Sequence, residues 1–263
     1  MDLGLHHRIA VVTGGSSGIG LATARLLLQE GARVAICGRD ADRLSAARHE
    51  LAASPGGDLF AQRCDVLDRD DVERFANAVA EWGGGRLDLL VNNAGQGRVS
   101  TFATTSDQDW HQELELKIFS QTLPIRGFKP LLDHSEAAAI VGVNSLLALQ
   151  PEPHMVATAA ARAAVQSLLK SLSVELAPTI RVNSILLGLV ESGQWQRRYE
   201  ARPDKAETRE AWFANLARSK HIPLGRLGLP EEAARAIVFL GSPAASYITG
   251  ASLEISGGVS RHI

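Results

Sequence analysis

Residues 13–20 carry side-chain types and a spacing that suit phosphate binding. The segment reads Thr-Gly-Gly-Ser-Ser-Gly-Ile-Gly and follows an apolar, β-branched run at 9–12. Glycine lacks Cβ, so its backbone can adopt positive φ and approach a ligand closely. A helix that begins near Gly18 would point unpaired N–H groups and partial positive charge at a pyrophosphate. Glycine spacing alone fits a tight strand-to-helix turn equally well, so this segment by itself leaves both interpretations open.

Length, charge and composition exclude several classes of protein. The 263 residues suffice for one large α/β domain with a substantial core. A net charge of −2 argues against a general nucleic-acid binder, which needs a basic excess to neutralise phosphates. No apolar run approaches the roughly 18 residues that span a membrane, and the first residues lack the build of a signal peptide. We therefore expect a soluble cytoplasmic protein, with Cys37 and Cys64 as buried free thiols and without a metal site.

Apolar segments alternate with alanine- and leucine-rich segments, which is typical of a parallel sheet covered by helices. Strands are expected at 9–12, 33–38, 58–64, 86–92, 137–143, 180–187 and 252–255. Helices are expected at about 18–30, 40–53, 69–82, 107–133, 154–176 and 230–241. The prediction is an α/β fold: a single doubly wound, Rossmann-type domain over 1–263, whose seven-stranded, mostly parallel sheet has helices on both faces. The charged and aromatic segment at about 190–222 is predicted to be a substrate lid.

Four loop segments are expected to meet at one edge of this sheet. In such folds ligands bind at the carboxyl ends of the strands, where the strand order reverses. The segments that fall there are 13–20, 38–39, 64–66 and 92–95. Their convergence predicts a dinucleotide site.

These ordered motifs resemble the short-chain dehydrogenase/reductase family over essentially the whole chain. Residues 13–20 match its TGxxxGIG loop, residues 92–95 its NNAG segment and residues 180–183 its IRVN strand. The segments 227–232 and 248–258 are similar to its C-terminal pattern. The resemblance implies a nicotinamide cofactor, hydride transfer to or from a small carbonyl or alcohol substrate, and a homotetramer.

The resemblance also implies which residues contact the cofactor. The expected contacts are Gly14, Ser16, Ser17, Gly18, Ile19, Gly20, Arg39, Asp65, Val66, Asn92, Ala94, Gly95, Arg162, Gly188, Val190 and Ser192.

The residues after the second expected strand indicate which dinucleotide binds. A carboxylate there would bind the ribose 2′-hydroxyl and repel a 2′-phosphate. This chain has Gly38 followed by Arg39, which leaves room for a phosphate and supplies a guanidinium to clamp it. We predict NADP(H) in preference to NAD(H). The alternative is that Arg39 meets only solvent or Asp42 on a helix surface.

The chain departs from the family pattern at the residues that handle protons. The usual set is Asn, Ser, Tyr and Lys, and the matching positions here hold Lys117, Ser145, Thr158 and Arg162. An aliphatic hydroxyl is far too weak an acid to replace a phenol near neutral pH, and arginine does not shuttle protons. Ser145 can still bond a substrate oxygen, and Arg162 can hold the cofactor ribose. Thr158 is expected to fill the space of the tyrosine.

We hypothesise that Lys117 is the acid/base of this rearranged centre, beside the fixed charge of Arg162. Like-charge repulsion and partial burial would lower the lysine pKa from about 10.4 to roughly 7–8, where it is a competent proton donor. Alternatively, Lys117 only bonds backbone carbonyls or water. His154 and Tyr199 are weaker candidates for the proton donor.

Two functions from different classes fit the sequence. One is an NADP(H)-dependent oxidoreductase with an atypical active site. The other is a dinucleotide-binding protein with little or no turnover, such as a sensor or a partner subunit. The retained Ser145 and the elaborate lid segment favour the enzyme.

Overall fold

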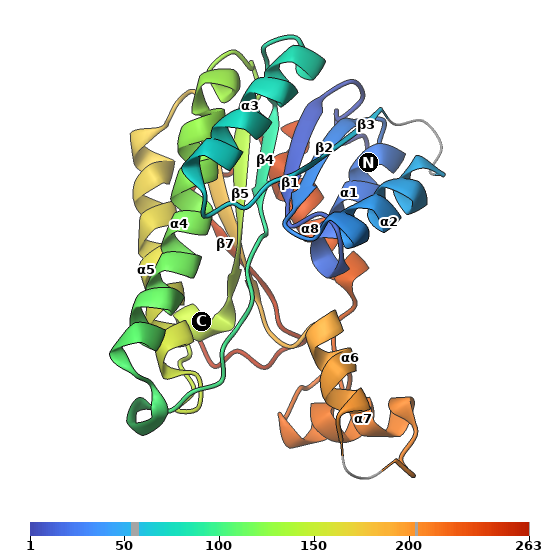
Figure 1. Ribbon diagram of the computed structural model, residues 1–263, viewed down its shortest axis with the longest axis vertical. Helices are drawn as coiled ribbons and strands as arrows, with labels where there is room; N and C mark the ends of the chain where they lie inside the picture. Colours follow the sequence, from blue (N-terminus) through green and yellow to red (C-terminus); the bar gives the residue numbers. More distant parts are fainter. Residues whose placement is uncertain (54–57, 203–204, 263) are drawn as a thin grey trace.

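The computed structural model describes residues 1–53, 58–202 and 205–262, the side chains of 194 and 197 excepted. Its centre is a seven-stranded sheet in the order β3-β2-β1-β4-β5-β6-β7 (Figure 1). All six strand pairings are parallel, which confirms the predicted fold class and makes the sheet fully rather than mostly parallel. The strands are β1 Ile9–Thr13, β2 Arg33–Gly38, β3 Leu59–Arg63, β4 Leu89–Asn92, β5 Ala139–Ser145, β6 Arg181–Leu187 and β7 Ser252–Ile255.

Helices cover both faces of the sheet, close to the ranges expected from the sequence (Figure 1). These helices are α1 Gly18–Gln29, α2 Ala41–Ala52, α3 Arg69–Gly83, α4 Asp107–Leu132, α5 Val156–Glu175 and α8 Pro230–Gly241. Two further helices, α6 Gly193–Glu200 and α7 Arg209–Ser219, lie in the segment predicted to be a lid, where no helix was expected. Three single 3-10 turns lie at Phe102–Thr104, Leu146–Ala148 and Pro243–Ala245. One face carries α1, α2 and α8, and the other carries α3, α4 and α5.

The inner strands are mostly apolar because they are buried on both faces, whereas the edge strands β3 and β7 are partly exposed and carry polar residues. In β1, Ala10 and Val12 point into the core under α1 and α8, whereas Ile9 and Val11 point into the core under α3 and α4. These four side chains are at most 2% exposed. Burial on both sides therefore holds β1 at the middle of the sheet, which is where the glycine-rich segment begins.

The strand order reverses between β1 and β4, and hydrogen bonds join the two chain segments that leave the sheet there. Asn93 Nδ2 donates to the carbonyl oxygens of Thr13 and Gly14, at 3.0 and 3.1 Å. The Thr13 hydroxyl accepts from the backbone N–H groups of Asn93 and Ala94, at 3.0 and 3.1 Å. These bonds set the spacing of the crevice in which a parallel sheet binds its ligand.

The described residues of 190–202 and 205–222 form a small unit beyond the carboxyl ends of the strands. Figure 1 shows α6 and α7 standing apart from the two helical layers. Phe213, Ala217, Ile222 and Leu227 make a core of their own, against which Trp195 packs. This position fits a lid, and the lid role itself stays a prediction.

The described helices and side chains were predicted to include neither a membrane span nor a metal site. None of the helices in 1–53, 58–202 and 205–262 combines the length and the apolar character that crossing a bilayer requires. Within the same ranges no group of three or more histidine, cysteine or acidic side chains could hold a metal ion. Cys37 and Cys64 are free and buried, as expected.

Truncating Phe128 tests the packing between α3 and α4. Its ring is 1% exposed and lies edge-on to Phe75, with 5.5 Å between centroids. We expect Phe128→Ala to lower the free energy of unfolding by about 3–5 kcal/mol, because the cavity cannot collapse fully. Urea unfolding followed by circular dichroism measures this, with Phe102→Ala, at a position 79% exposed, as the control. A loss below about 1 kcal/mol for Phe128→Ala would contradict the assigned packing.

Candidate functional site

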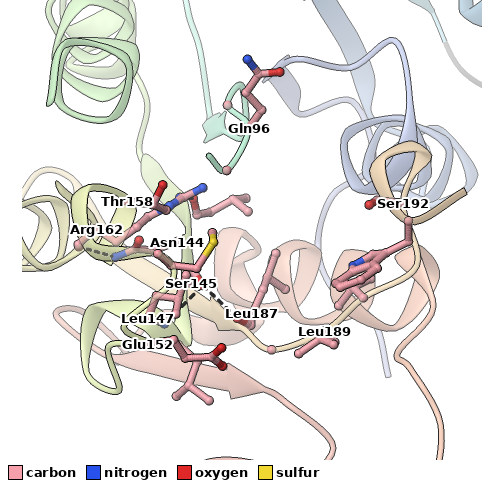
Figure 2. Close-up of a pocket in the computed structure, with 18 of the residues that line it drawn as sticks. Gln96, Asn144, Ser145, Leu147, Glu152, Thr158, Arg162, Leu187, Leu189 and Ser192 are labelled. Carbon is pink, nitrogen blue, oxygen red and sulfur yellow. Dashed lines mark hydrogen bonds between the residues drawn. The ribbon is translucent and has the colours of Figure 1, made fainter. Parts of the chain in front are cut away.

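A cleft of about 330 Å³ opens at the carboxyl edge of the sheet. It is lined by Ile19 of α1, by the segment after β4, by the end of β5 and the start of α5, and by the stretch from β6 into α6. Figure 2 shows Asn144, Ser145, Thr158 and Arg162 grouped together, with Ser192 across the cleft from them. The cleft therefore brings together segments from five elements that are distant in the sequence.

The glycine-rich segment leaves space at the N-terminus of α1. Gly14 and Gly18 have φ of +64° and +54°, a region that side-chain-bearing residues rarely adopt. A Cβ added at Gly18 would meet no atom within 4 Å, whereas one added at Gly20 would lie 2.3 Å from the Gly14 carbonyl oxygen. Ser17, at the N-cap, makes no capping bond with its side chain. An open helix N-terminus with an uncommitted hydroxyl fits a diphosphate.

The next two predicted contact segments lie at the ends of β2 and β3. Arg39 is 59% exposed, and its Nη1 lies 4.0 Å from Asp65 Oδ2, so its described ionic neighbour is Asp65 rather than Asp42. A Cβ at Gly38 would come within 3.0 Å of the Ser16 hydroxyl. Val66 is buried, 7% exposed. A mostly free guanidinium beside a small residue fits a 2′-phosphate.

The last three predicted cofactor contacts lie just after β6. Gly188, Val190 and Ser192 all line the cleft. A Cβ at Gly188 would lie 2.9 Å from the Ser256 Cα, so only glycine fits between these backbones. Val190 forms an isolated bridge with Gly228, which fixes the chain where it turns toward α6.

Ser145 is the last residue of β5, where the expected strand would have ended two residues earlier. Its hydroxyl donates to the Leu187 carbonyl oxygen at 3.3 Å and accepts from the Leu147 N–H at 3.3 Å. Both contacts are long for hydrogen bonds of a hydroxyl. Ser145 lines the cleft, so its hydroxyl can turn to a substrate oxygen at little cost.

Arg162 comes from the middle of the second turn of α5 and reaches the floor of the cleft. Its Nη1 donates to the Val143 carbonyl oxygen at 3.0 Å, and its buried Nε has no partner in the described part of the chain. Burial lowers the pKa of Arg162 from its ordinary value to about 10, so the group is charged at neutral pH. A fixed cation with a spare donor suits the ribose hydroxyls of a dinucleotide.

Thr158 stands at the tyrosine position but does not point its hydroxyl freely into the cleft. Its Oγ1 donates to Glu113 Oε2 at 2.6 Å and accepts from the Arg98 N–H at 3.2 Å. The residue is 2% exposed and lines the cleft with part of its surface. In this arrangement the hydroxyl is committed to α4 and to the segment after β4, and the expectation that Thr158 fills the space of a tyrosine stays a prediction.

Lys117 is 2% exposed, and it is not one of the cleft-lining residues that the structure describes. Its Nζ donates to the Gln96 carbonyl oxygen at 2.7 Å and to Glu113 Oε2 at 3.0 Å. Burial and the nearby Arg162 charge lower the pKa of Lys117 from 10.5 to about 8, against an opposing effect of Glu113. The value agrees with that expected of a proton donor, whereas the role of Lys117 stays a prediction.

Glu113 belongs to this centre and was missed in the sequence. The signal was present, since Glu113 precedes Lys117 by four residues, the spacing at which two side chains meet on one helix face. Such pairs are common on solvated helix surfaces, so the spacing alone does not distinguish a buried pair from an exposed one. Asn93, which joins the two loops at the switch point, was also passed over because its neighbours carried the motif.

The two weaker candidates for the proton donor lie in different surroundings. His154 precedes α5 rather than lying on it, lines the cleft, and has Nε2 3.1 Å from Glu152 Oε2. Tyr199 packs edge-on against Trp212, and its hydroxyl lies 3.5 Å from the Glu207 carbonyl oxygen. Tyr199 is outside the described lining of the cleft, so His154 is the better placed of the two.

The protonation state of Lys117 can be measured directly. In a protein labelled with ¹³C at the lysine Cε, we expect one resonance to titrate with a midpoint near pH 8, because burial and Arg162 disfavour the ammonium. Lys117→Met identifies the resonance by removing it. A midpoint above about 10, the range of an unperturbed lysine, would contradict the burial described here.

Comparison with known proteins agrees with this geometry. A family model described as Enoyl-(Acyl carrier protein) reductase matches residues 14–260. A 3-oxoacyl-(acyl-carrier-protein) reductase from Chlamydia trachomatis is 31% identical over 258 residues, which cover 97% of this chain and 98% of that protein.

Solved structures resemble the chain over its full length. A short chain oxidoreductase from Pseudomonas aeruginosa PAO1, described as containing an atypical catalytic center, is 58% identical with a TM-score of 0.95 and covers 100% of both chains. An NADPH-bound structure described in the same words is 57% identical, with a TM-score of 0.92, and covers 98% of this chain and 100% of that one. L-sorbose reductase from Gluconobacter frateurii, complexed with NADPH and L-sorbose, is 32% identical with a TM-score of 0.94 over 100% of both chains. By sequence and by structure, the chain belongs to the short-chain dehydrogenase/reductase family.

Proposed function

We propose that this protein is an NADP(H)-dependent oxidoreductase that transfers a hydride between the nicotinamide and a carbonyl or alcohol substrate. The observation that carries the proposal is the continuity of the cleft, which runs from Ile19 at the start of α1 to Ser145, Thr158 and Arg162. The NADPH-bound Pseudomonas relative, 57% identical, supports the choice of cofactor. The full-length match to reductases supports turnover over the alternative of a non-catalytic binding protein.

The bound dinucleotide supplies the hydride, and the chain's own residues hold the reactants and the charge. The N-terminus of α1 would hold the diphosphate, and Arg39 the 2′-phosphate. Ser145 would donate its hydroxyl to the substrate oxygen. Arg162 would hold the ribose and keep the floor of the cleft positive as negative charge develops on that oxygen.

Lys117 would supply the proton in reduction and accept it in oxidation. In the arrangement described, the ammonium bonds the Gln96 carbonyl oxygen and Glu113 Oε2, so the Lys117 side chain would have to turn into the cleft to pass a proton from Nζ directly to the substrate oxygen. The 190–222 unit would close over the substrate, since Ser192, Trp195 and Arg198 line the cleft.

Assembly and location are further parts of the proposal. Val174 of α5 is 73% exposed and Leu253 of β7 is 40% exposed. These exposed apolar side chains support a homo-oligomer, and the resemblance to the family implies that it is a tetramer. The cytoplasmic location stays a prediction from composition.

Removing the Lys117 ammonium tests the mechanism. We expect Lys117→Met to lower kcat for carbonyl reduction by about 10²–10⁴-fold, the usual contribution of acid–base catalysis, with little change in NADPH affinity. In the parent, reduction should decline as pH rises through about 8, because the donor loses its proton, and the variant should lack this limb. NADPH oxidation against a panel of carbonyl compounds measures both effects.

The matched control for this experiment is Lys129→Met, at an exposed position of the same helix paired with Asp133. An unchanged rate and pH profile in Lys117→Met would refute the acid/base role. Tight NADPH binding without turnover on any carbonyl or alcohol would refute the enzyme and favour a binding protein.

The cofactor preference is tested at Arg39. We expect Arg39→Ala to weaken NADPH binding by about 10–100-fold, the equivalent of a charge-assisted bond of about 1.5–3 kcal/mol, and to leave NADH binding unchanged. Fluorescence titration of the two cofactors measures the ratio. Arg43→Ala is the control, since Arg43 is equally exposed and pairs with Asp40. A preference that survives Arg39→Ala would show that another residue selects the cofactor.

A further inference from the structure

Glu113 is a buried carboxylate at the centre of the polar cluster beside the cleft. It lies on α4, one helical turn before Lys117, and is 3% exposed. Its Oε2 accepts from Lys117 Nζ at 3.0 Å and from Thr158 Oγ1 at 2.6 Å. One oxygen atom therefore joins a cation of α4 to a hydroxyl of α5.

Three elements direct charged groups at Lys117. Glu113 comes from α4, Arg162 from α5 and Arg98 from the segment after β4, with Arg98 Nε 3.9 Å from Glu113 Oε1. The outer end of Arg98 forms an ion pair with Asp109, so Asp109 serves the exposed side of the cluster. Within the described ranges, Glu113 is the one carboxylate in contact with Lys117.

In this arrangement Glu113 is needed to compensate the charge of Lys117. Removing one partner of a buried ion pair leaves an uncompensated charge in a medium of low polarity, which is far more costly than removing both. Here the remaining neighbours of Lys117 would be two further cations, Arg98 and Arg162. An ammonium in such surroundings would give up its proton.

The same carboxylate also holds the wall of the cleft. Thr158 Oγ1, which donates to Glu113, accepts from the Arg98 N–H at 3.2 Å. Lys117 Nζ, the other donor to Glu113, bonds the Gln96 carbonyl oxygen at 2.7 Å. Gln96 and Thr158 both line the cleft, so Glu113 orients the groups that lie between Lys117 and the substrate space.

From these contacts we infer that Glu113 is a positioning residue of the reaction centre: it is the buried counter-ion that keeps Lys117 protonated, and it fixes the Thr158 hydroxyl. The inference rests on the proposed function only in the catalytic role given to Lys117. The charge of Lys117 itself can be measured without turnover.

Replacing Glu113 by glutamine removes the charge and keeps the shape. In ¹³C-lysine-labelled protein we expect Glu113→Gln to lower the titration midpoint of Lys117 by about 1–3 pH units relative to the parent, because an opposite charge at this distance favours the charged form by that much. In turnover assays the decline of reduction with rising pH should move in the same direction and by the same amount. Glu115→Gln, at an exposed position two residues on, is the matched control and should leave both midpoints in place.

Each outcome of this experiment either supports or overturns the role of Glu113. A Lys117 midpoint in Glu113→Gln within about 0.3 pH unit of the parent's would overturn the inference. If Glu113→Gln does not fold, recovery of folding in the double variant Glu113→Gln/Lys117→Met supports the counter-ion role, and failure to recover overturns it. A shifted midpoint in a protein without turnover would leave the role of Glu113 standing and refute the proposed enzyme, so the two failures are distinguishable.

Discussion

The constraint on which the centre of this molecule depends is the placement of Lys117 beside Arg162 in a largely buried space. Lys117 and Arg162 lie close enough for one to lower the pKa of the other, and Arg98 adds a third positive charge. A low-polarity interior tolerates such a group only when a carboxylate and enough hydrogen-bond acceptors are present. Glu113 supplies the carboxylate, and the carbonyl oxygens of Gln96 and Val143 accept from Lys117 and Arg162. α4, α5 and the segment after β4 are thereby held against each other at the edge of the cleft.

This constraint explains how a family that relies on a phenol can accommodate a threonine. With tyrosine and lysine, the acidic group points at the substrate and the cation lowers its pKa. With Thr158 and Arg162, the hydroxyl is no longer acidic and the cation no longer titrates near neutral pH. In this chain Lys117 lies on the neighbouring helix, and its pKa is lowered to about 8 by the same burial and like-charge repulsion that make its counter-ion necessary. The replacements at 117, 158 and 162 are therefore best understood as one set, together with the carboxylate of Glu113 that Lys117 and Thr158 share.

At the cofactor end of the cleft, the shape of the site depends more on the positions of the backbone than on side chains. Gly18 leaves open space at the start of α1, Gly20 allows the helix to pack on the Gly14 carbonyl, and Gly188 passes within van der Waals contact of Ser256. Asn93 then joins the two loops that leave β1 and β4. Because these features depend on the close approach of backbones, they do not depend on which side chains lie at the other end of the cleft.

The sequence by itself determined the fold class, the position of most helices and strands, and the edge of the sheet at which ligands bind. It could do so because the hydrophobic periodicity, the positions of glycines and the runs of apolar residues are local properties of the sequence that depend directly on backbone geometry. The flanking motifs also predict that Lys117, Thr158 and Arg162 replace three members of the usual set and that Ser145 is retained, because these motifs fix the register. Only the tertiary structure decided that Lys117 is turned from the cleft toward Glu113, and that the Thr158 hydroxyl is committed to the same carboxylate. The hydrogen-bond partners and the burial of these side chains depend on how α4, α5 and the segment after β4 pack together. A Glu and a Lys four residues apart in the sequence would fit an exposed pair on a helix surface equally well.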